Sequence, residues 1–158
     1  MGENKRGFPW QKLIFWLYAL WLVVFVVVKF DGHPAHLLDR MEHFAAIRAS
    51  EPGFNLNLIP FASIRMQVRH WGEDWAIKNL VGNILAFVPF GCLLPWAYKG
   101  LRRLWKVGLI ALASICAIEV FQYLTLLGAC DIDDLMLNLL GCLVGYLVFR
   151  RMRGEETR

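Results

Sequence analysis

Polar residues inside otherwise apolar stretches are the first candidates for chemistry in this sequence. Glu119 and Gln122 lie three residues apart in one such stretch, so a helix would place both side chains on one face. A carboxyl group in apolar surroundings either keeps its proton or pairs with a cation, and both states suit general acid or base chemistry. We therefore predict a catalytic role for Glu119, with Gln122 as a substrate-binding residue.

An acidic cluster follows further along the chain. Asp131, Asp133 and Asp134 fall within four residues, and Asn138 comes one helical turn after Asp134. Asp131, Asp134 and Asn138 would share a face of a helix that begins at Asp131. One carboxylate can cap the N-terminus of that helix, where unpaired main-chain NH groups favour negative charge. Because three carboxylates exceed that need, we predict catalytic roles for Asp131 and Asp134 and substrate binding by Asn138.

The same carboxylates have an alternative use as metal ligands. Together with Glu119 they offer oxygen ligands of the kind that hard divalent cations prefer. Mutual repulsion among them is relieved equally well by protonation, so a divalent cation stays an alternative and no metal ligand is assigned. His36, Asp39 and His43 would share a helix face, but three zinc ligands on a loop-like segment favour solvated surface.

Two further amides lie in another apolar stretch. Asn79 and Asn83 are four residues apart and would share a helix face. We predict that both bind substrate. The alternative, which applies equally to the amides named above, is that they form hydrogen bonds between helices, worth about 1 kcal/mol each.

Four apolar stretches are long enough to position these residues within a bilayer. A spanning helix needs about 20 mostly apolar residues. The stretches are 13–30, 76–96, 105–127 and 132–149. The first has no small-residue cleavage site after it, which indicates a retained span and not a signal peptide. With 58% hydrophobic and 19% charged residues, the composition predicts an all-α integral membrane four-helix bundle, a single domain over residues 1–158.

Basic residues indicate the direction of these spans. They cluster before the first span, between the second and third, and after the fourth, whereas the link before the fourth is acidic. The positive-inside rule then predicts a plasma-membrane protein with both termini in the cytoplasm. Although the net charge is +4, short basic clusters between apolar runs argue against nucleic-acid binding.

The long outer segment, 31–75, divides at Pro52 and Gly53. On both sides apolar residues recur at helical spacing, which predicts two short interfacial helices; a partly ordered loop is the alternative. With a rise of about 1.5 Å per residue, Asn83, Glu119 and Asn138 lie roughly 9–12 Å below the outer ends of their helices. Comparable depths on three helices predict one polar pocket in the outer leaflet.

Four separated motifs carry a resemblance to a known family. They are NLIPF at 57–61, NILAFVPFG at 83–91, IEVFQ at 118–122 and DIDDLMLNLLG at 131–141. In this order they resemble the successive motifs of VanZ-like membrane proteins, over roughly residues 55–148. The family's namesake is associated with low-level resistance to the glycopeptide teicoplanin, so the resemblance implies a role at the cell envelope.

Two functional hypotheses follow from the residues and the resemblance. The first is an enzyme that acts on a membrane lipid or a lipid-linked envelope precursor. The second is a non-catalytic protein that binds a lipid or an antibiotic, or that organises envelope enzymes. A transporter is a weaker third hypothesis, because four spans without a visible inverted repeat are few, although a homo-oligomer would enlarge the bundle.

Overall fold

A computed structural model of the protein describes residues 8–28, 35–51 and 53–156. Its helices and strands follow the chain in this order: α1 (Trp10–Val28), α2 (Ala35–Ser50), β1 (Leu56–Asn57), α3 (Ala62–Arg69), α4 (Asp74–Ala97), the 3₁₀ helix η1 (Lys99–Leu101), α5 (Leu104–Thr125), β2 (Cys130–Asp131) and α6 (Ile132–Glu156). The predicted all-α class is confirmed, and the two-residue strands form the single sheet among the described residues.

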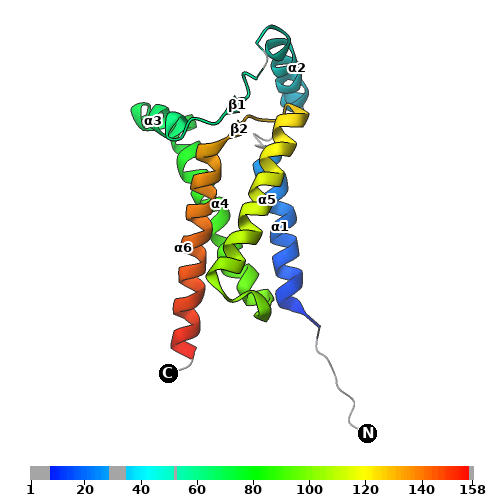
Figure 1. Cartoon of the computed structure of the whole chain (residues 1–158). Helices are drawn as coiled ribbons and strands as arrows, with labels where there is room; N and C mark the ends of the chain where they lie inside the picture. The colour runs from blue at the N-terminus through cyan, green and yellow to red at the C-terminus, as the bar shows by residue number, and fades with distance from the viewer. Residues whose placement is uncertain (1–7, 29–34, 52, 157–158) are drawn as a thin grey trace.

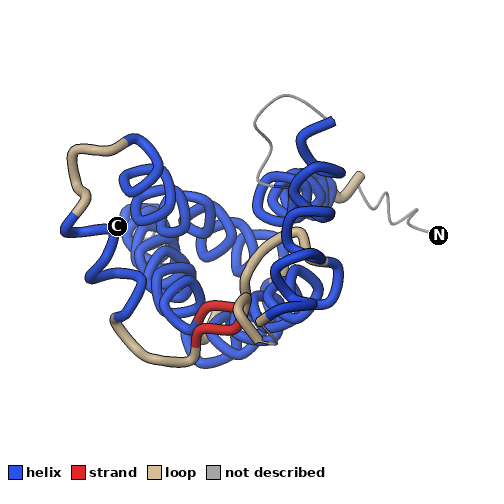
Figure 2. The backbone as a smooth tube through the Cα atoms, turned by 90° about the horizontal axis from the view of Figure 1, so that it is seen from above, coloured by secondary structure: helices blue, strands red, loops and turns tan. Residues whose placement is uncertain are grey.

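Helices α1, α4, α5 and α6 run side by side (Figure 1). The strands lie at one end of this group, which we call the strand end, and α1 begins and α6 ends at the opposite end, which we call the basal end. Figure 2, viewed along the helices, shows the two strands beside each other across the helix ends. Because the strand end and the basal end are far apart, each can hold a separate site.

Three described helices are long and apolar enough to cross a membrane. They are α4 and α5 over their whole lengths and α6 as far as Gly154. The apolar helix Trp10–Val26 within α1 is shorter, and the end of the predicted first span lies in residues 29–34, outside the described residues. Large apolar side chains on the outer surface of α1, such as Trp16 and Leu20, are exposed, as expected of a surface that faces lipid.

Helices α4 and α6 pack with their backbones in close approach. A Cβ atom added to Gly141 would lie 2.0 Å from the carbonyl oxygen of Ile84, and one added to Gly145 would lie 1.8 Å from that of Val88. Gly91 on α4 meets the backbone of α6 in the same way. Only glycine fits such a contact, so Gly141 and Gly145 are what allow the two helices to pack this closely.

The apolar core fills the middle and the basal half of the helix group. Phe15 from α1, Phe87 and Phe90 from α4, Ile115 from α5 and Tyr146 from α6 are all buried in it. Buried polar side chains are found instead toward the strand end. The apolar core therefore supports the helices in their middle and basal half, and the buried polar side chains gather at the strand end.

Helices α2 and α3 lie in the predicted outer segment. In Figure 1, α3 projects beside α4 and α6, whereas α2 stands above α1 and α5. On α2, Phe44 packs edge-on against Phe54 with ring centroids 5.4 Å apart. On α3, Gln67 is buried, whereas Arg65 and Arg69 are exposed.

The short parallel sheet joins this outer segment to the start of α6. Leu56 pairs with Cys130 and Asn57 pairs with Asp131. The main-chain NH of Cys130 also donates to the carbonyl oxygen of Asn55 at 2.8 Å. The sheet thereby brings the NLIPF motif against the DIDD motif, a contact that apolar periodicity did not predict.

Candidate functional site at the strand end

Asp131 is the centre of the contacts beside the sheet. Its carboxylate accepts hydrogen bonds from Asn57 Nδ2 at 3.2 Å, from the Ser63 hydroxyl, and from the main-chain NH of Asp133 at 2.8 Å. These donors come from β1, α3 and the first turn of α6. Asp131 therefore ties three elements together at the rim of the cluster.

Asp133 holds the beginning of α3 in place. Its side chain is fully buried, with Oδ1 accepting from the Phe61 NH at 2.6 Å and Oδ2 accepting from the Ile64 NH at 3.0 Å. Phe61 has φ 65°, in the left-handed region, and offers no side-chain cap to α3. The predicted acidic cap of α6 is supplied by Asp131, which accepts from the Asp133 NH, whereas Asp133 caps α3 and not its own helix.

Asn83 and Asp134 are brought together across the α4–α6 interface. Asn83 Nδ2 donates to Asp134 Oδ1 at 2.5 Å, and both residues are half-buried. Asn79 lies one turn closer to the strand end on α4 and is also half-buried. The predicted convergence of α4 and α6 polar residues is present for this pair.

Glu119 lies beneath the start of α6. It is 4% exposed, and its Oε2 accepts a hydrogen bond from the main-chain NH of Asp131 at 3.1 Å. This bond links the buried carboxyl of α5 to the residue that anchors the sheet. Glu119 and Asp131, both predicted as site residues, are therefore neighbours.

Gln122 joins a different pair of elements. Its Nε2 donates to the carbonyl oxygen of Val26 at 3.0 Å, and the side chain is 2% exposed. Gly128 packs against it, since a Cβ atom there would lie 3.1 Å from Nε2. This amide thus ties α5 to α1, a helix-to-helix contact of the kind left open as the alternative role for such residues.

Asn138 is the most unusual residue of the cluster. It is 1% exposed, and neither Nδ2 nor Oδ1 has a hydrogen-bond partner among the described residues. It lies one helical turn after Asp134 on α6, and Asp134 in turn bonds Asn83. A buried polar group left unpaired costs about 1–3 kcal/mol, so these two atoms call for an explanation.

The structure adds polar residues that sequence reasoning missed. Asn55 is 1% exposed, and its Nδ2 lies 3.4 Å from the carbonyl oxygens of both Tyr123 and Gly128. Asn55 Oδ1 and Gln67 Oε1 are buried and have no partner within the described ranges. Both lie outside the apolar stretches, so their burial depends on the sheet and α3. The one available signal was the NLIPF motif at 57–61, which begins two residues after Asn55.

Positive charge also lies near the strand end. The guanidinium of Arg48 stands over the ring of Tyr123 at 4.6 Å, with Nη1 3.4 Å from the Tyr123 carbonyl oxygen. Arg65 and Arg69 are exposed one turn apart on α3. Cations therefore accompany the carboxylates and amides at this end.

The thiol of Cys130 lies within the cluster, on β2. Burial raises its pKa, and the negative charges of Glu119 and Asp131 raise the pKa further. The thiol therefore stays protonated at neutral pH, which makes it a poor nucleophile.

The described residues include no group of three or more His, Cys, Asp or Glu side chains arranged to hold a metal ion. Asp131, Asp133 and Asp134 direct their carboxylates at different protein donors. His36, Asp39 and His43 are exposed on α2. The described residues therefore offer no set of ligands for the divalent cation that was considered as an alternative.

Comparisons with known proteins agree with the motifs. A family model described as VanZ/LLP1 matches residues 15–153. The chain is 27% identical over 95 residues to "Protein VanZ" of Enterococcus faecium, a match that covers 60% of this chain and 52% of the relative. The chain thus spans about half the length of that curated relative. No solved structure matches it. Since the family match extends over most of the sequence, the chain belongs to the VanZ/LLP1 family of membrane proteins.

Proposed function

We propose that this chain acts at the cell envelope and binds the polar part of a membrane lipid or a lipid-linked envelope precursor at the strand end. In this proposal α1, α4, α5 and α6 all cross the plasma membrane, both termini are cytoplasmic, and α2 and α3 lie at the outer surface. The distribution of basic residues supports this direction. The strand-end cluster then faces the outer leaflet.

Asn138 is the observation that carries the proposal. Its two unpaired amide atoms lie in the interior, on the helix whose preceding turn carries Asp134, the partner of Asn83. An amide can donate to and accept from a sugar hydroxyl or a peptide group of an envelope intermediate, and it can donate to a phosphate. Such a ligand would supply the hydrogen bonds that the protein leaves unmade.

Glu119 is the residue we assign to acid or base chemistry. It is buried, and the main-chain NH of Asp131 fixes one carboxyl oxygen. In our scheme Asp134 and Asn83 orient the polar group of the substrate, and Asp131 positions Glu119 through that main-chain bond. Arg48, Arg65 and Arg69 would attract an anionic substrate to the outer surface.

Comparative lipid analysis of cells lacking the protein tests this assignment. The complementing variants are Glu119→Gln and, as a matched control, Glu42→Gln on the exposed surface of α2. A glutamine at 119 keeps an oxygen that can accept the Asp131 hydrogen bond, so the fold should persist. We expect a lipid or lipid-linked precursor to change on deletion and to return with wild type and Glu42→Gln, but not with Glu119→Gln. Unchanged lipids in the deletion strain would refute the proposal.

A non-catalytic binding role is the second candidate, and one observation favours it. The carboxylates of Asp131 and Asp133 are already engaged by protein donors, as expected of a preformed recognition site. Equal rescue by Glu119→Gln and wild type would select this candidate over the enzyme. Teicoplanin susceptibility, measured in the same strains, would show whether the association of the family's namesake extends to this chain.

A further inference from the structure

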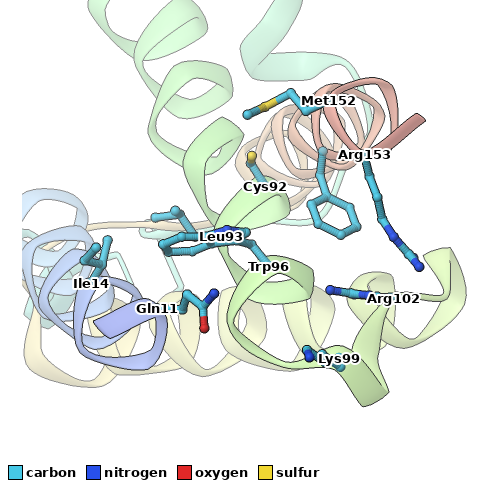
Figure 3. A pocket seen from close by; sticks show the side chains of 10 residues that line it. Gln11, Ile14, Cys92, Leu93, Trp96, Lys99, Arg102, Met152 and Arg153 are labelled. Atoms are coloured by element: carbon cyan, nitrogen blue, oxygen red, sulfur yellow. The ribbon is translucent and has the colours of Figure 1, made fainter. Parts of the chain in front are cut away.

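A separate cavity lies at the basal end, opposite the candidate site. Its volume is about 640 Å³, and it is lined by residues from the first turns of α1, the end of α4, η1 and the end of α6 (Figure 3). The predicted site residues lie at the other end of the helices. The proposed function therefore does not involve this cavity.

Three cationic side chains line the cavity, from two elements. Lys99 is the first residue of η1 and Arg102 follows its last, and both line the cavity. Arg153 comes from the last turn of α6, and Figure 3 shows its side chain extending toward Arg102. Among the described lining residues none is acidic. The cavity is therefore suited to an anion.

Contacts with the protein fix the position of Arg102. Its Nε lies 3.5 Å from the carbonyl oxygen of Pro95, and its guanidinium carbon lies 5.9 Å from the ring centroid of Phe149. The Arg102 carbonyl oxygen accepts a hydrogen bond from the Tyr146 hydroxyl at 2.9 Å. A charge that only set the direction of insertion would need no such placement, because topology depends on the number of basic residues in the link.

The rest of the lining is apolar. Ile14, Leu93, Trp96 and Met152 contribute hydrocarbon surface beside the cations. A neighbouring cavity of about 260 Å³ shares Arg102, Phe149 and Arg153 and adds Arg150, which extends the basic surface. Basic pockets between membrane helices, with apolar walls, are typical sites for anionic lipid head groups.

We propose that the basal cavity binds an anionic phospholipid of the adjoining leaflet. Its phosphate contacts Lys99, Arg102 and Arg153, and an acyl chain lies along Leu93 and Trp96. The shared chemistry is a phosphate ester, which a soluble phosphate compound also offers. The apolar wall favours the lipid, because a soluble phosphate would leave that wall uncovered.

Lipid binding to the purified full chain in detergent, followed by native mass spectrometry, tests this proposal. The probes are phosphatidylglycerol and phosphatidylcholine with identical acyl chains, and glycerol phosphate as a competitor. We expect phosphatidylglycerol to bind in preference to phosphatidylcholine, and glycerol phosphate at equal concentration not to displace it. Equal binding of both lipids, or displacement by glycerol phosphate, would overturn the proposal.

Two neighbouring arginines provide a matched pair of variants. Arg102→Gln and Arg103→Gln remove the same charge from adjacent positions, but Arg103 is exposed and does not line the cavity. We expect Arg102→Gln to weaken phosphatidylglycerol binding about fivefold and Arg103→Gln to leave it within about twofold. Arg102→Lys, which keeps the charge, should restore most of the binding. Equal losses in the Arg102→Gln and Arg103→Gln variants would refute a specific site.

Alkylation of Cys92 in the wild-type protein gives a readout that needs no variant. This half-buried residue lines the cavity, and Figure 3 shows its sulfur atom there. Phosphatidylglycerol should slow its alkylation, measured by peptide mass spectrometry, more than phosphatidylcholine does. The same rate with both lipids would count against occupation of the cavity even if a variant failed to fold.

Discussion

At the scale of single residues, the carboxylates of the strand end perform distinct tasks despite their closeness in sequence. Asp133 caps α3, Asp134 meets Asn83 from α4, and Asp131 ties β1 and α3 to α6. Glu119 alone among these carboxylates comes from α5. The cluster is therefore assembled from side chains that also hold its walls together.

Replacing Asp133 should destabilise the protein. Asp133→Ala removes the acceptor of two main-chain hydrogen bonds at the start of α3, and the side chain is fully buried. We expect a loss of about 2–4 kcal/mol, seen as a lower melting temperature in detergent. Asp74→Ala, in the exposed first turn of α4, is the control and should cost about 1 kcal/mol or less. If the two variants had the same melting temperature, the capping role of Asp133 would be wrong.

The reactivity of Cys130 should report the charge of Glu119. Because the neighbouring carboxylates raise the thiol pKa, less thiolate is present at a given alkaline pH than for an ordinary cysteine. Glu119→Gln removes one of these charges, lowers the pKa of Cys130 and should speed its alkylation, with the rate profile moving to lower pH. Glu42→Gln should leave the profile unchanged. Coincident profiles for wild type and Glu119→Gln would contradict the placement of Glu119 beside Cys130.

At the scale of elements, the helices were easier to predict than the contacts between them. The apolar lengths predicted α4, α5 and the start of α6 to within two residues, because hydrocarbon thickness sets the length of a span. The predicted last span ended at 149, whereas α6 continues to Glu156 through basic residues that a helix tolerates beyond the membrane. The β1–β2 pairing was missed, since two-residue strands carry no periodic signal.

Within the candidate site, too, positions along one helix were easier to predict than contacts between elements. Helical spacing and depth selected Asn83 and Asp134, which form a hydrogen bond between α4 and α6, whereas the role of Asn138 stays a prediction. The burial of Asn55 and Gln67 was not predictable, because it depends on how a non-spanning segment folds back over the helix ends. Spacing along one helix specifies a shared face but not the partner that the face meets.

The glycine contacts between α4 and α6 give a test at this scale. In Gly141→Ala the new methyl group would lie 2.0 Å from the Ile84 carbonyl oxygen, so the helices must move apart. We expect a loss of about 1–3 kcal/mol in thermal unfolding measurements. Gly108→Ala in α5, where a Cβ meets nothing within 4 Å, is the control and should be neutral or stabilising by about 1 kcal/mol. Equal stability of the two variants would be inconsistent with the packing described.

At the scale of the whole molecule, the two ends have different chemistry. The strand end gathers buried amides and carboxylates, and the basal end gathers cations around a cavity with apolar walls. The packed core between them holds both in place. Such a difference between the two ends is expected of a protein that crosses a membrane in one fixed direction.

The direction of the chain is open to a direct test with compartment-specific reporters. A reporter that matures only in the cytoplasm should be active when fused after residue 158 or before residue 1. The same reporter should be inactive when inserted at Gly53, between α2 and β1. An active reporter at Gly53, or an inactive reporter at either terminus, would contradict the proposed topology.

Replacement of Asn138 by leucine tests the central claim most directly, because leucine fills a similar volume without polar atoms. If the two unpaired amide atoms exist to bind a ligand, Asn138→Leu should melt at or above the wild-type temperature and yet fail to restore the lipid that changes on deletion. A variant that restores that lipid fully, or one that unfolds readily because the amide supports the fold, would contradict the account.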